Sequence, residues 1–594
     1  MKISKTAFKE YAKCERVYPL ENIYIKKLDS NISYFDEEKI TDILSLMFDE
    51  DTGDDLIIND DESLKEMLEF YNEVERHAVE IASKKFGGEI KYHKETKDQK
   101  VFSYVDESGH NFYCYLDGYL EKDNEVIIIE VKATTSRKFL EAGSKKNSLF
   151  KDDNNILVLN KPEEGDKVFN NHYEKLFDIF SSTGKYVFDL AIERYIVEES
   201  IKRHYPELLK KKFKYYLGIL NSEYVFDGKY KDGQPVYSDE LIKFVDLSDI
   251  TKEYLPKVDN IKNDIIEEIK AKELPKEVFG KKCGYKSQSE CIFIDICFPK
   301  LKEKGSITEY MQTRSFGPGK MSKADLINKG LYKLDDIDIK WLNNENNIIQ
   351  RNCFTKGIEY INKSKIKAGI HSLKYPIYHL DFESFPSPLP RFSYEKPYTQ
   401  SLFQFSVHIE KSPGKCDFIE DNYSYLVSDF KDNRRELVEK LIEVINLSEG
   451  GTVLVYNMSF EYSRLSELIG IFPEYKEALE KIQDAMFDLI DIVKTNKNLY
   501  TNLGFSEEES KIVNYYHSDL RGSYSIKKVL PLFSDLSYSD LSVQNGNEAI
   551  YSYIKFRRLS KEEIEEIRTD LIDYCRQDTW AMVVILNELR NRVK

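Results

Sequence analysis

The strongest constraint on the fold is the alternation of strand and helix patterns over the last third of the chain. From Tyr375 to Lys594 the pattern is strand, strand, helix, strand, helix, and then a long helix that begins near Lys561. Such an alternation predicts a separate α/β domain. A chain of 594 residues has room for three or four domains, so this region accounts for only part of it.

Composition and charge exclude several classes of protein. Hydrophobic residues make up 41% of the chain and charged residues 32%. The hydrophobic share is large enough to form buried cores, which argues against global disorder. The net charge of −17 repels phosphate at long range and disfavours a passive nucleic-acid coat. An enzyme that binds divalent cations at acidic clusters stays compatible with this charge. Without a membrane-length apolar run or a signal-peptide core, a cytoplasmic protein with no membrane contact is expected.

Three motifs in the last domain supply candidate catalytic residues. Asp381 and Glu383 are two apart on a predicted strand, so both project from one face and can share metal ions. Glu461 lies on the first turn of a helix that follows an apolar strand. Tyr574 and Asp578 are four apart on the final helix and share one face. Each pattern alone also occurs on solvated surfaces, and it is their order that indicates a site.

In this order the motifs resemble those of DEDD-type exonucleases of the ribonuclease H-like fold, in the subgroup with tyrosine in the last motif. The resemblance implies that Asp381, Glu383 and Asp578 bind two divalent cations, Mg²⁺ or Mn²⁺. It also implies that Glu461 is the fourth acid and that Tyr574 orients the attacking water. The family usually has aspartate at the position of Glu461.

Further polar residues of this domain are weaker candidates. Asp488, and His517 together with Asp519, are candidates to border a substrate groove. Lys527 and Lys528 are candidates to contact phosphate. The alternative for each of them is an ordinary surface role.

A second set of candidates lies in a predicted hairpin in the amino-terminal half. Two β-rich runs are separated by the turn-forming residues 122–124. Asp117 ends the first run, and Glu130 and Lys132 lie on one face of the second. Carboxylates in such a place hold a cation and a lysine positions water, whereas a surface ion pair is the structural alternative.

The segment LDGYLEKDNEVIIIEVKATT resembles the core of PD-(D/E)XK nucleases, particularly the RecB and CRISPR-adaptation branch. The resemblance implies a metal ion held by Asp117 and Glu130, with Lys132 as a catalytic residue. His77, on an upstream predicted helix, stands where that branch often has a further metal ligand. Glu193 and Tyr195 stand where the branch has a glutamine and tyrosine motif, and the match there is imperfect.

Three cysteines close together provide an independent signal. Cys283, Cys291 and Cys297 have the spacing Cys-x7-Cys-x5-Cys, with Cys14 far upstream as the candidate fourth ligand. Four thiolates hold an iron–sulfur cluster or zinc, and the residues alone leave that choice open. The same nuclease branch holds a [4Fe–4S] cluster with one amino-terminal cysteine and a carboxyl-terminal trio, so the resemblance favours iron. The other cysteines show no ligand spacing and are expected to be ordinary thiols: Cys114, Cys353, Cys416 and Cys575.

Over nearly its full length the chain resembles the bacterial family named domain of unknown function 2779, whose members couple a cysteine-clamped RecB-like nuclease to a DEDD-like domain. The expected fold is a multidomain α/β chain. It has a restriction-endonuclease-like PD-(D/E)XK domain at 1–304, a helical connector at 305–372 and a ribonuclease H-like exonuclease domain at 373–594. The stretches 40–64, which is strongly acidic, and 142–166, which is polar, are expected to form loops.

The expected function is that of a metal-dependent nuclease: a 3′–5′ exonuclease on DNA with a second PD-(D/E)XK site, in DNA repair or antiviral defence. RNA is the alternative substrate, because DEDD chemistry does not depend on the 2′-hydroxyl. A competing class is a nucleic-acid-binding or scaffold protein in which one or both sites are inactive. A third is a zinc- or iron-stabilised adaptor that recruits a helicase, because related nucleases often work beside motor proteins. The chain has no Gly-x4-Gly-Lys-Ser/Thr loop, so unwinding would come from a partner.

Overall fold

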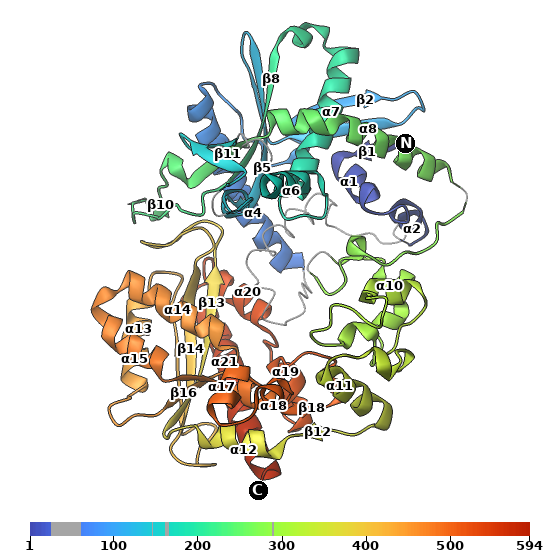
Figure 1. Cartoon of the computed structure of the whole chain (residues 1–594). Coiled ribbons are helices and arrows are strands. Elements are labelled where there is room, and N and C mark those ends of the chain that lie inside the picture. Colours follow the sequence, from blue (N-terminus) through green and yellow to red (C-terminus); the bar gives the residue numbers. More distant parts are fainter. Residues whose placement is uncertain (25–60, 145–146, 161–165, 272, 288–289) are drawn as a thin grey trace. The chain divides into compact units, whose positions relative to one another are not determined.

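The computed structural model describes residues 1–24, 61–144, 147–160, 166–271, 273–287 and 290–594 (Figure 1). These residues form two units. Unit 1 contains the described residues of 1–294 together with 386–399, and unit 2 contains 295–385 and 400–594. Each unit combines helices with sheets, so the mixed α/β multidomain class is confirmed. Residues 40–60 of the predicted acidic loop lie outside the described residues. The prediction of a loop is wrong for residues 61–64, which begin the helix α4 (Asp61–Phe86).

The larger sheet of unit 1 has the predicted hairpin at one edge. In spatial order its strands are β4 (Gly118–Glu121), β5 (Glu125–Thr135), β8 (Lys212–Leu220), β11 (Ile242–Asp246), β7 (Ile156–Leu159) and β6 (Phe150–Asp153). Strands β4 and β5 pair antiparallel around the turn at 122–124, which confirms the hairpin. Strand β5 then pairs parallel with β8 and is buried between its first and last residues, which is why its sequence is a nearly continuous apolar run.

The expectation of a loop over residues 142–166 is wrong for the centre of that stretch. Strands β6 and β7 form an antiparallel hairpin there, and β7 pairs in parallel with β11. The run that forms β7 is only four residues long. A run so short gives a weak periodic signal, and its pairing with a distant strand decides its conformation.

The remaining elements of unit 1 surround this sheet and a smaller one. The smaller sheet has the order β1 (Lys2–Ser4), β3 (Asn111–Leu116), β2 (Lys100–Val105). The helix predicted from residue 63 to residue 86 is present as α4. The longer helices are α1 (Lys5–Lys13), α2 (Val17–Tyr24), α4 (Asp61–Phe86), α6 (Lys167–Glu174), α7 (Gly184–His204) and α8 (Ser248–Lys270). Helix α7 is buried over most of its first four turns and packs against α1, α8 and β2.

Unit 2 is built on a five-stranded sheet with its first strand at the centre. In spatial order the strands are β15 (Asn422–Leu426), β14 (Gln400–Glu410), β13 (Ile377–Pro386), β16 (Thr452–Val455) and β17 (Met486–Asp488). Strand β13 pairs parallel with β16, and β16 with β17, whereas β14 and β15 are antiparallel. The predicted alternation is therefore present, together with two short edge strands, β15 and β17, that the sequence pattern did not indicate.

Helices cover this sheet and complete unit 2. The long final helix begins at Lys561, as expected, because the Ser560 side chain accepts a hydrogen bond from the Glu563 N–H in a capping box. It packs against β14 and β15. The longer helices are α11 (Glu345–Lys356), α12 (Lys363–His371), α13 (Arg434–Val444), α14 (Met458–Ile471), α15 (Lys476–Asp484), α20 (Gly546–Lys555) and α21 (Lys561–Arg592).

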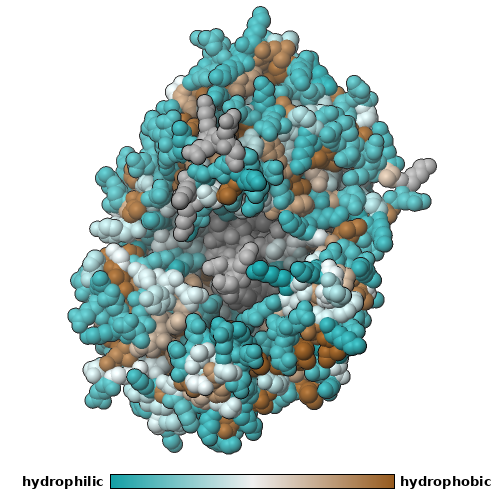
Figure 2. All heavy atoms as spheres, viewed as in Figure 1, coloured by the Kyte–Doolittle hydropathy of each residue, from teal (hydrophilic) through white to brown (hydrophobic). Residues whose placement is uncertain are grey.

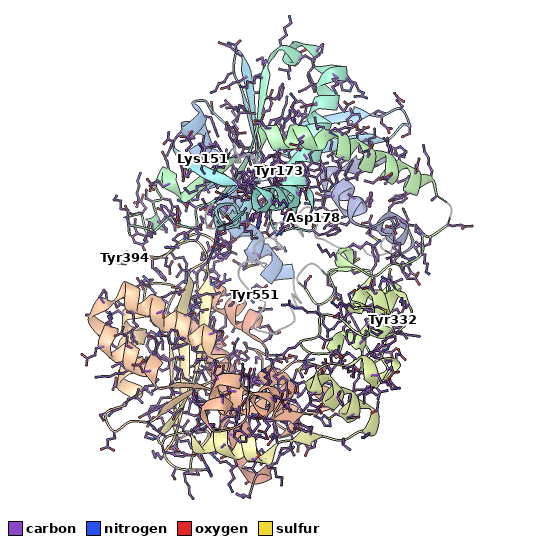
Figure 3. All side chains as sticks on the ribbon, in the orientation of Figure 1. Lys151, Tyr173, Asp178, Tyr332, Tyr394 and Tyr551 are labelled. Atoms are coloured by element: carbon purple, nitrogen blue, oxygen red, sulfur yellow. The ribbon has the colours of Figure 1, made fainter. Side chains whose placement is uncertain are left out.

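The segment 386–399 belongs to unit 1, although β13 and β14 on either side of it in sequence belong to unit 2. The Phe226 N–H donates to the Glu395 carbonyl, and the Tyr394 N–H donates to the Phe226 carbonyl, each at 2.9 Å. Tyr230 donates its hydroxyl to the Arg391 carbonyl at 2.7 Å. Tyr394, labelled in Figure 3, is 66% exposed, so the segment is held by its backbone rather than by this side chain.

Hydrophilic residues dominate the face of the molecule drawn in Figure 2, where hydrophobic residues form only small patches. Within the described ranges, no helix combines the length and the apolar character needed to cross a membrane.

Candidate functional site

Within the part of the chain that the structure describes, one group of metal-ligating side chains has three donor atoms within 4.8 Å of one another. It consists of Asp381 and Glu383 on β13 and Cys575 on α21. The Cys575 thiol donates a hydrogen bond to Asp381 Oδ2 at 3.5 Å. The structure therefore unites two predicted ligands with a residue that the sequence interpretation treated as an ordinary thiol.

The other predicted acids of unit 2 interact electrostatically with this group. Asp578, on α21, accepts a hydrogen bond from the Tyr538 hydroxyl at 2.6 Å. Glu461, on the first turn of α14, is only 3% exposed, and its Oε2 has no hydrogen-bond partner. Burial raises the pKa of Glu461, and the charge of Asp381 raises it further. Burial likewise raises the pKa of Asp381, with Asp578 as the next cause, so these carboxyl groups oppose one another's ionisation.

A tyrosine pair and a lysine border the acidic group. Tyr574 is 4% exposed, and its ring centroid lies 6.1 Å from that of Tyr538. Lys527 Nζ lies 5.6 Å from the Tyr538 ring and 5.9 Å from the Tyr574 ring. The charge of Lys527 also lowers the pKa of Asp381 in part. The predicted phosphate contact Lys527 is thus beside the predicted catalytic residues.

Asp488 has a structural role at this edge of the sheet. Its carboxylate accepts hydrogen bonds from the N–H groups of Asn457 at 3.1 Å, Met458 at 2.8 Å and Ile490 at 3.0 Å. These bonds fix the start of α14, where Asn457 has a left-handed backbone with φ of 74°. Asp488 therefore positions Glu461 through the backbone.

Two other weak candidates of unit 2, His517 and Asp519, have ordinary partners. His517 Nδ1 lies 3.2 Å from Asp519 Oδ2, so these two residues pair with each other. Asp519 also pairs with Lys304. Lys528 follows Lys527 on the short helix α19 (Ile526–Val529).

The donor set of the unit 2 cluster fits a divalent cation. Asp381 and Glu383 have donor atoms within 4.8 Å of each other, whereas Glu461 and Asp578 do not join that group of close donors among the described residues. The charges of Asp578 and Asp381 oppose each other's ionisation, and the charge of Asp381 opposes that of Glu461. Carboxylate oxygens suit Mg²⁺ and Mn²⁺. The Glu461 oxygen without a hydrogen-bond partner is the kind of atom that a cation or a cation-bound water satisfies.

In unit 1, Glu130 and Lys132 are part of a buried ion-pair network. Lys5 Nζ lies 2.7 Å from Glu130 Oε2 and 2.9 Å from Glu193 Oε2. Lys132 Nζ lies 3.0 Å from Glu130 Oε1 and 2.8 Å from Asp189 Oδ2. Each of these five side chains is less than 10% exposed. Sequence reasoning missed Lys5 and Asp189, which come from α1 and α7.

Glu193 is the acid of this network whose neutral form is favoured. Burial raises the pKa of Glu193, and a side-chain hydrogen bond with Glu130 also favours its protonated form, although the charge of Lys5 lowers its pKa. Burial raises the pKa values of Glu130 and Asp189 too, but the charges of Lys5 and Lys132 lower them. Lys9 Nζ lies 3.4 Å from Asp189 Oδ2, and the Lys9 side chain is 12% exposed. Three ammonium groups then face two carboxylates and one neutral acid.

Asp117 has a different set of contacts from Glu130. Its Oδ2 accepts a hydrogen bond from the Val131 N–H at 2.8 Å, and its Oδ1 accepts one from Gln99 Nε2 at 3.3 Å. Gln99 also donates to Glu75 Oε1 at 2.9 Å. The Tyr71 hydroxyl donates to the Val131 carbonyl at 2.7 Å. Burial raises the pKa of this hydroxyl, the charge of Lys132 lowers it, and the charges of Asp117 and Glu75 raise it further. A buried tyrosine hydroxyl thus lies near these two acids.

The predicted metal ligand His77 lies against an aromatic ring. The His77 and Tyr237 ring centroids are 5.1 Å apart, and Arg76 Nη2 is 3.1 Å from His77 Nε2. Burial, together with the Arg76 charge, lowers the pKa of His77 to about 4. Among the described residues, His77, Asp117 and Glu130 do not form a group with donor atoms within 4.8 Å.

The amino-terminal cysteine lies beside the segment that carries two of the predicted trio. Lys282 Nζ is 3.0 Å from the Glu15 carboxylate and also interacts with the Cys14 thiol. The Cys291 N–H donates to the Cys283 carbonyl at 3.0 Å. Cys297 ends α9 (Ile294–Cys297), at the point where the chain passes into unit 2. A set of thiol donors fits an iron–sulfur cluster or zinc.

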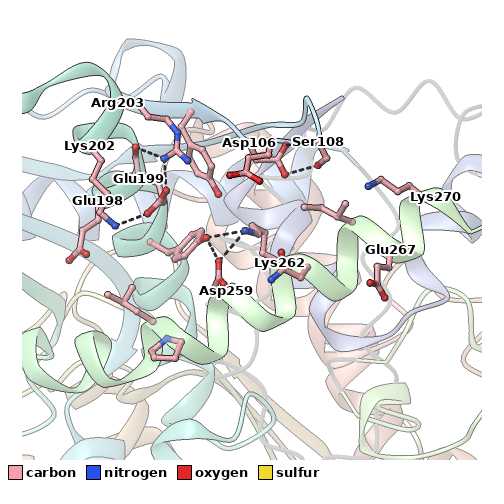
Figure 4. Close-up of a pocket in the computed structure, with 17 residues that line it drawn as sticks. Asp106, Ser108, Glu198, Glu199, Lys202, Arg203, Asp259, Lys262, Glu267 and Lys270 are labelled. Carbon is pink, nitrogen blue, oxygen red and sulfur yellow. Dashed lines mark hydrogen bonds and ion pairs between the residues drawn. The ribbon is translucent and has the colours of Figure 1, made fainter.

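A cavity of about 680 Å³ opens among α7, α8 and the turn that follows β2 (Figure 4). Tyr195 lines it and donates its hydroxyl to Asp259 Oδ1 at 2.5 Å. Lys262 Nζ lies 3.0 Å from the same oxygen. The predicted pair Glu193 and Tyr195 is therefore divided between the buried ion-pair network and this cavity.

One family model matches a stretch of the chain that carries part of the acidic cluster. Residues 378–525 match the domain of unknown function DUF2779. This stretch includes Asp381, Glu383 and Glu461 and ends before α21.

Two curated proteins are similar to part of the chain. Uncharacterized protein UU173 of Ureaplasma parvum serovar 3 is 30% identical over 230 residues, covering 36% of this chain and 31% of that protein. Uncharacterized protein MG366 of Mycoplasma genitalium is 27% identical over 250 residues, covering 39% of this chain and 34% of that protein. The chain thus spans about a third of the length of each. No solved structure matches the chain.

Proposed function

We propose that the protein is a metal-dependent nuclease that hydrolyses phosphodiester bonds at the acidic cluster of unit 2. The observation that carries the proposal is the convergence of acids from three distant stretches of sequence. Asp381 and Glu383 come from the central strand, Glu461 from the start of α14, and Asp578 from α21. A mixed sheet with its first strand at the centre supports the ribonuclease H-like fold that the motifs predict.

Each residue of the cluster has a defined part in this chemistry. Asp381, Glu383 and Asp578 would hold divalent cations, Mg²⁺ or Mn²⁺. When bound, two such ions lower the pKa of the attacking water and stabilise the leaving oxygen. The Tyr574 hydroxyl orients the water, and the Lys527 ammonium binds a phosphate oxygen of the substrate.

Contacts behind the cluster keep these groups in position. The Tyr538 hydroxyl restrains the Asp578 carboxylate through a buried hydrogen bond. Asp488 restrains the first turn of α14 and with it Glu461. We further propose that the enzyme removes nucleotides from 3′ ends of DNA, with RNA as the alternative polymer.

Unit 1 supports two candidate roles. Its resemblance to PD-(D/E)XK nucleases favours a second metal-dependent site at Asp117, Glu130 and Lys132, and a [4Fe–4S] cluster or zinc at the cysteines. The ion-pair network favours a different role, because Lys5 supplies a positive charge at Glu130 where a metal ion would act. Under that second candidate, unit 1 is a nucleic-acid-binding platform, and cleavage occurs in unit 2 alone.

The deciding experiment measures Mn²⁺-dependent degradation of nucleic acids labelled at the 5′ or the 3′ end, single- or double-stranded, DNA or RNA. Wild type is compared with Asp381→Asn and Glu130→Gln. Glu443→Gln is the matched control, since Glu443 forms an exposed ion pair with Lys440 on α13. All four proteins are first shown to have the same circular dichroism spectrum.

Each outcome of this experiment has a defined meaning. Loss of degradation in Asp381→Asn, with activity retained in Glu130→Gln and Glu443→Gln, supports a working site in unit 2 and a platform in unit 1. Loss of degradation in Glu130→Gln alone would indicate that the working site lies in unit 1. Wild-type protein that binds nucleic acid but degrades none of these substrates refutes the nuclease proposal and favours a binding protein.

A further inference from the structure

The position of Cys575 distinguishes the unit 2 cluster from a site made of carboxylates alone. The residue is completely buried in the middle of α21, three residues before Asp578 and therefore on the same side of the helix. Its sulfur is one of three donor atoms within 4.8 Å, together with oxygens of Asp381 and Glu383. Because these donors come from a central strand and a long helix, they form a preorganised set.

The sulfur–oxygen separation fits shared coordination of one ion. In a tetrahedral site with metal–sulfur and metal–oxygen bonds of about 2.3 Å and about 2.1 Å, the two donors lie about 3.6 Å apart. Cys575 Sγ and Asp381 Oδ2 are 3.5 Å apart. An ion could therefore bind between them with little movement of either backbone.

A second observation at the same place also indicates a missing ligand. Glu461 is 3% exposed, and its Oε2 has no hydrogen-bond partner. Burial raises the pKa of Glu461, and the charge of Asp381 is the next largest cause. A buried carboxylate oxygen in that condition is costly unless a cation or an ordered water satisfies it. The cluster thus has an unsatisfied acceptor in addition to its three close donors.

We propose that the Cys575 thiolate is a ligand of the unit 2 metal site, so that this site prefers a borderline ion such as Co²⁺ or Zn²⁺ over Mg²⁺. The inference deepens the proposed function, because it names the class of cation. Thiolate ligands favour softer transition metals, whereas Mg²⁺ takes oxygen ligands and retains its water. On binding, the thiol releases its proton to solvent, and a sulfur–metal bond replaces the hydrogen bond to Asp381.

The test follows Co²⁺ titration of the full chain by absorption spectroscopy, which reads the ligand type without any nuclease reaction. Wild type is compared with Cys575→Ser and Cys575→Ala. Cys353→Ser is the matched control, because Cys353 is another buried thiol of unit 2, with its sulfur 3.8 Å from the Tyr516 carbonyl. The cysteines of the predicted cluster contribute equally to all four proteins, so the difference spectra isolate Cys575.

We expect a thiolate-to-cobalt charge-transfer band in wild type and Cys353→Ser that is reduced in both Cys575 variants. Zn²⁺ affinity should fall about tenfold or more in those variants, the scale of losses seen when a metal site is altered. Identical spectra and Zn²⁺ affinities in wild type, Cys575→Ser and Cys575→Ala would overturn the proposal and leave Cys575 as a hydrogen-bond donor.

A parallel nuclease assay separates this inference from the proposed function. If wild type shows the Cys575-dependent band but degrades no nucleic acid, the metal site stands and the nuclease function fails. If Cys575→Ser degrades nucleic acid with an unchanged preference between Co²⁺ and Mg²⁺, the nuclease stands and the ligand role of Cys575 fails.

Discussion

Replacing Lys5 with methionine should destabilise unit 1 strongly, because it removes the ammonium group that pairs with both Glu130 and Glu193 in a buried network. Lys5 Nζ lies within 3 Å of both Glu130 and Glu193. Removing one partner of a buried ion pair typically costs about 3–5 kcal/mol, since the remaining charge is uncompensated. For a unit of this size each kcal/mol lowers the melting temperature by about 2–4 °C, so we expect a fall of roughly 10 °C.

Glu193→Gln provides the matched contrast. Because burial raises the pKa of Glu193 and favours its neutral form, an uncharged amide of the same shape should cost less than about 1 kcal/mol. Lys5→Met combined with Glu130→Gln removes one charge of each sign and should recover part of the loss. Urea unfolding followed by circular dichroism measures all three. If Glu193→Gln is as damaging as Lys5→Met, the neutral state described for Glu193 is wrong.

Three further predictions concern unit 2. Tyr538→Phe removes the buried hydrogen bond to Asp578 and should raise the metal concentration needed for half-maximal activity about 10–100-fold, with unchanged melting temperature; an unaltered metal titration would contradict this. Ser560→Ala removes the cap of α21 and should lower the free energy of unfolding by about 1 kcal/mol in urea titrations, while activity persists. Burial lowers the pKa of His408 to about 4, so the unfolded chain binds a proton first as the pH falls. The urea midpoint should therefore fall between about pH 6.5 and about pH 4, and less so in His408→Gln; equal slopes in both proteins would exclude this residue as the cause.

The elements with strong local signals were predictable from the sequence. The capping pattern at Ser560 predicts the start of α21, and the β-rich run over residues 124–134 predicts β5. The placement of Asp381 and Glu383 on a strand followed from their flanking apolar residues. In these cases the deciding interactions lie within a few residues along the chain.

The parts that were missed depend on contacts between distant residues. Lys5 enters the network of Glu130 only because α1 packs against α7, and nothing near Lys5 in sequence indicates this. Cys575 was a recoverable omission, because it precedes Asp578 by three residues and so shares its side of the helix. The short strand β7 could not be predicted from its own residues, because its conformation depends on pairing with the distant strand β11.

The segment 386–399 has a consequence for the order of folding during synthesis. A ribosome that has finished residue 294 has made all of unit 1 except this segment, which supplies partners for Phe226 and Tyr230. Domains generally fold as units while the chain emerges from its amino-terminal end. In this protein, unit 1 can complete its fold only after β13 and the segment 386–399 have also emerged. Its completion is therefore tied to the synthesis of the strand that carries Asp381 and Glu383, and a nascent chain stopped before residue 399 would carry neither unit in finished form.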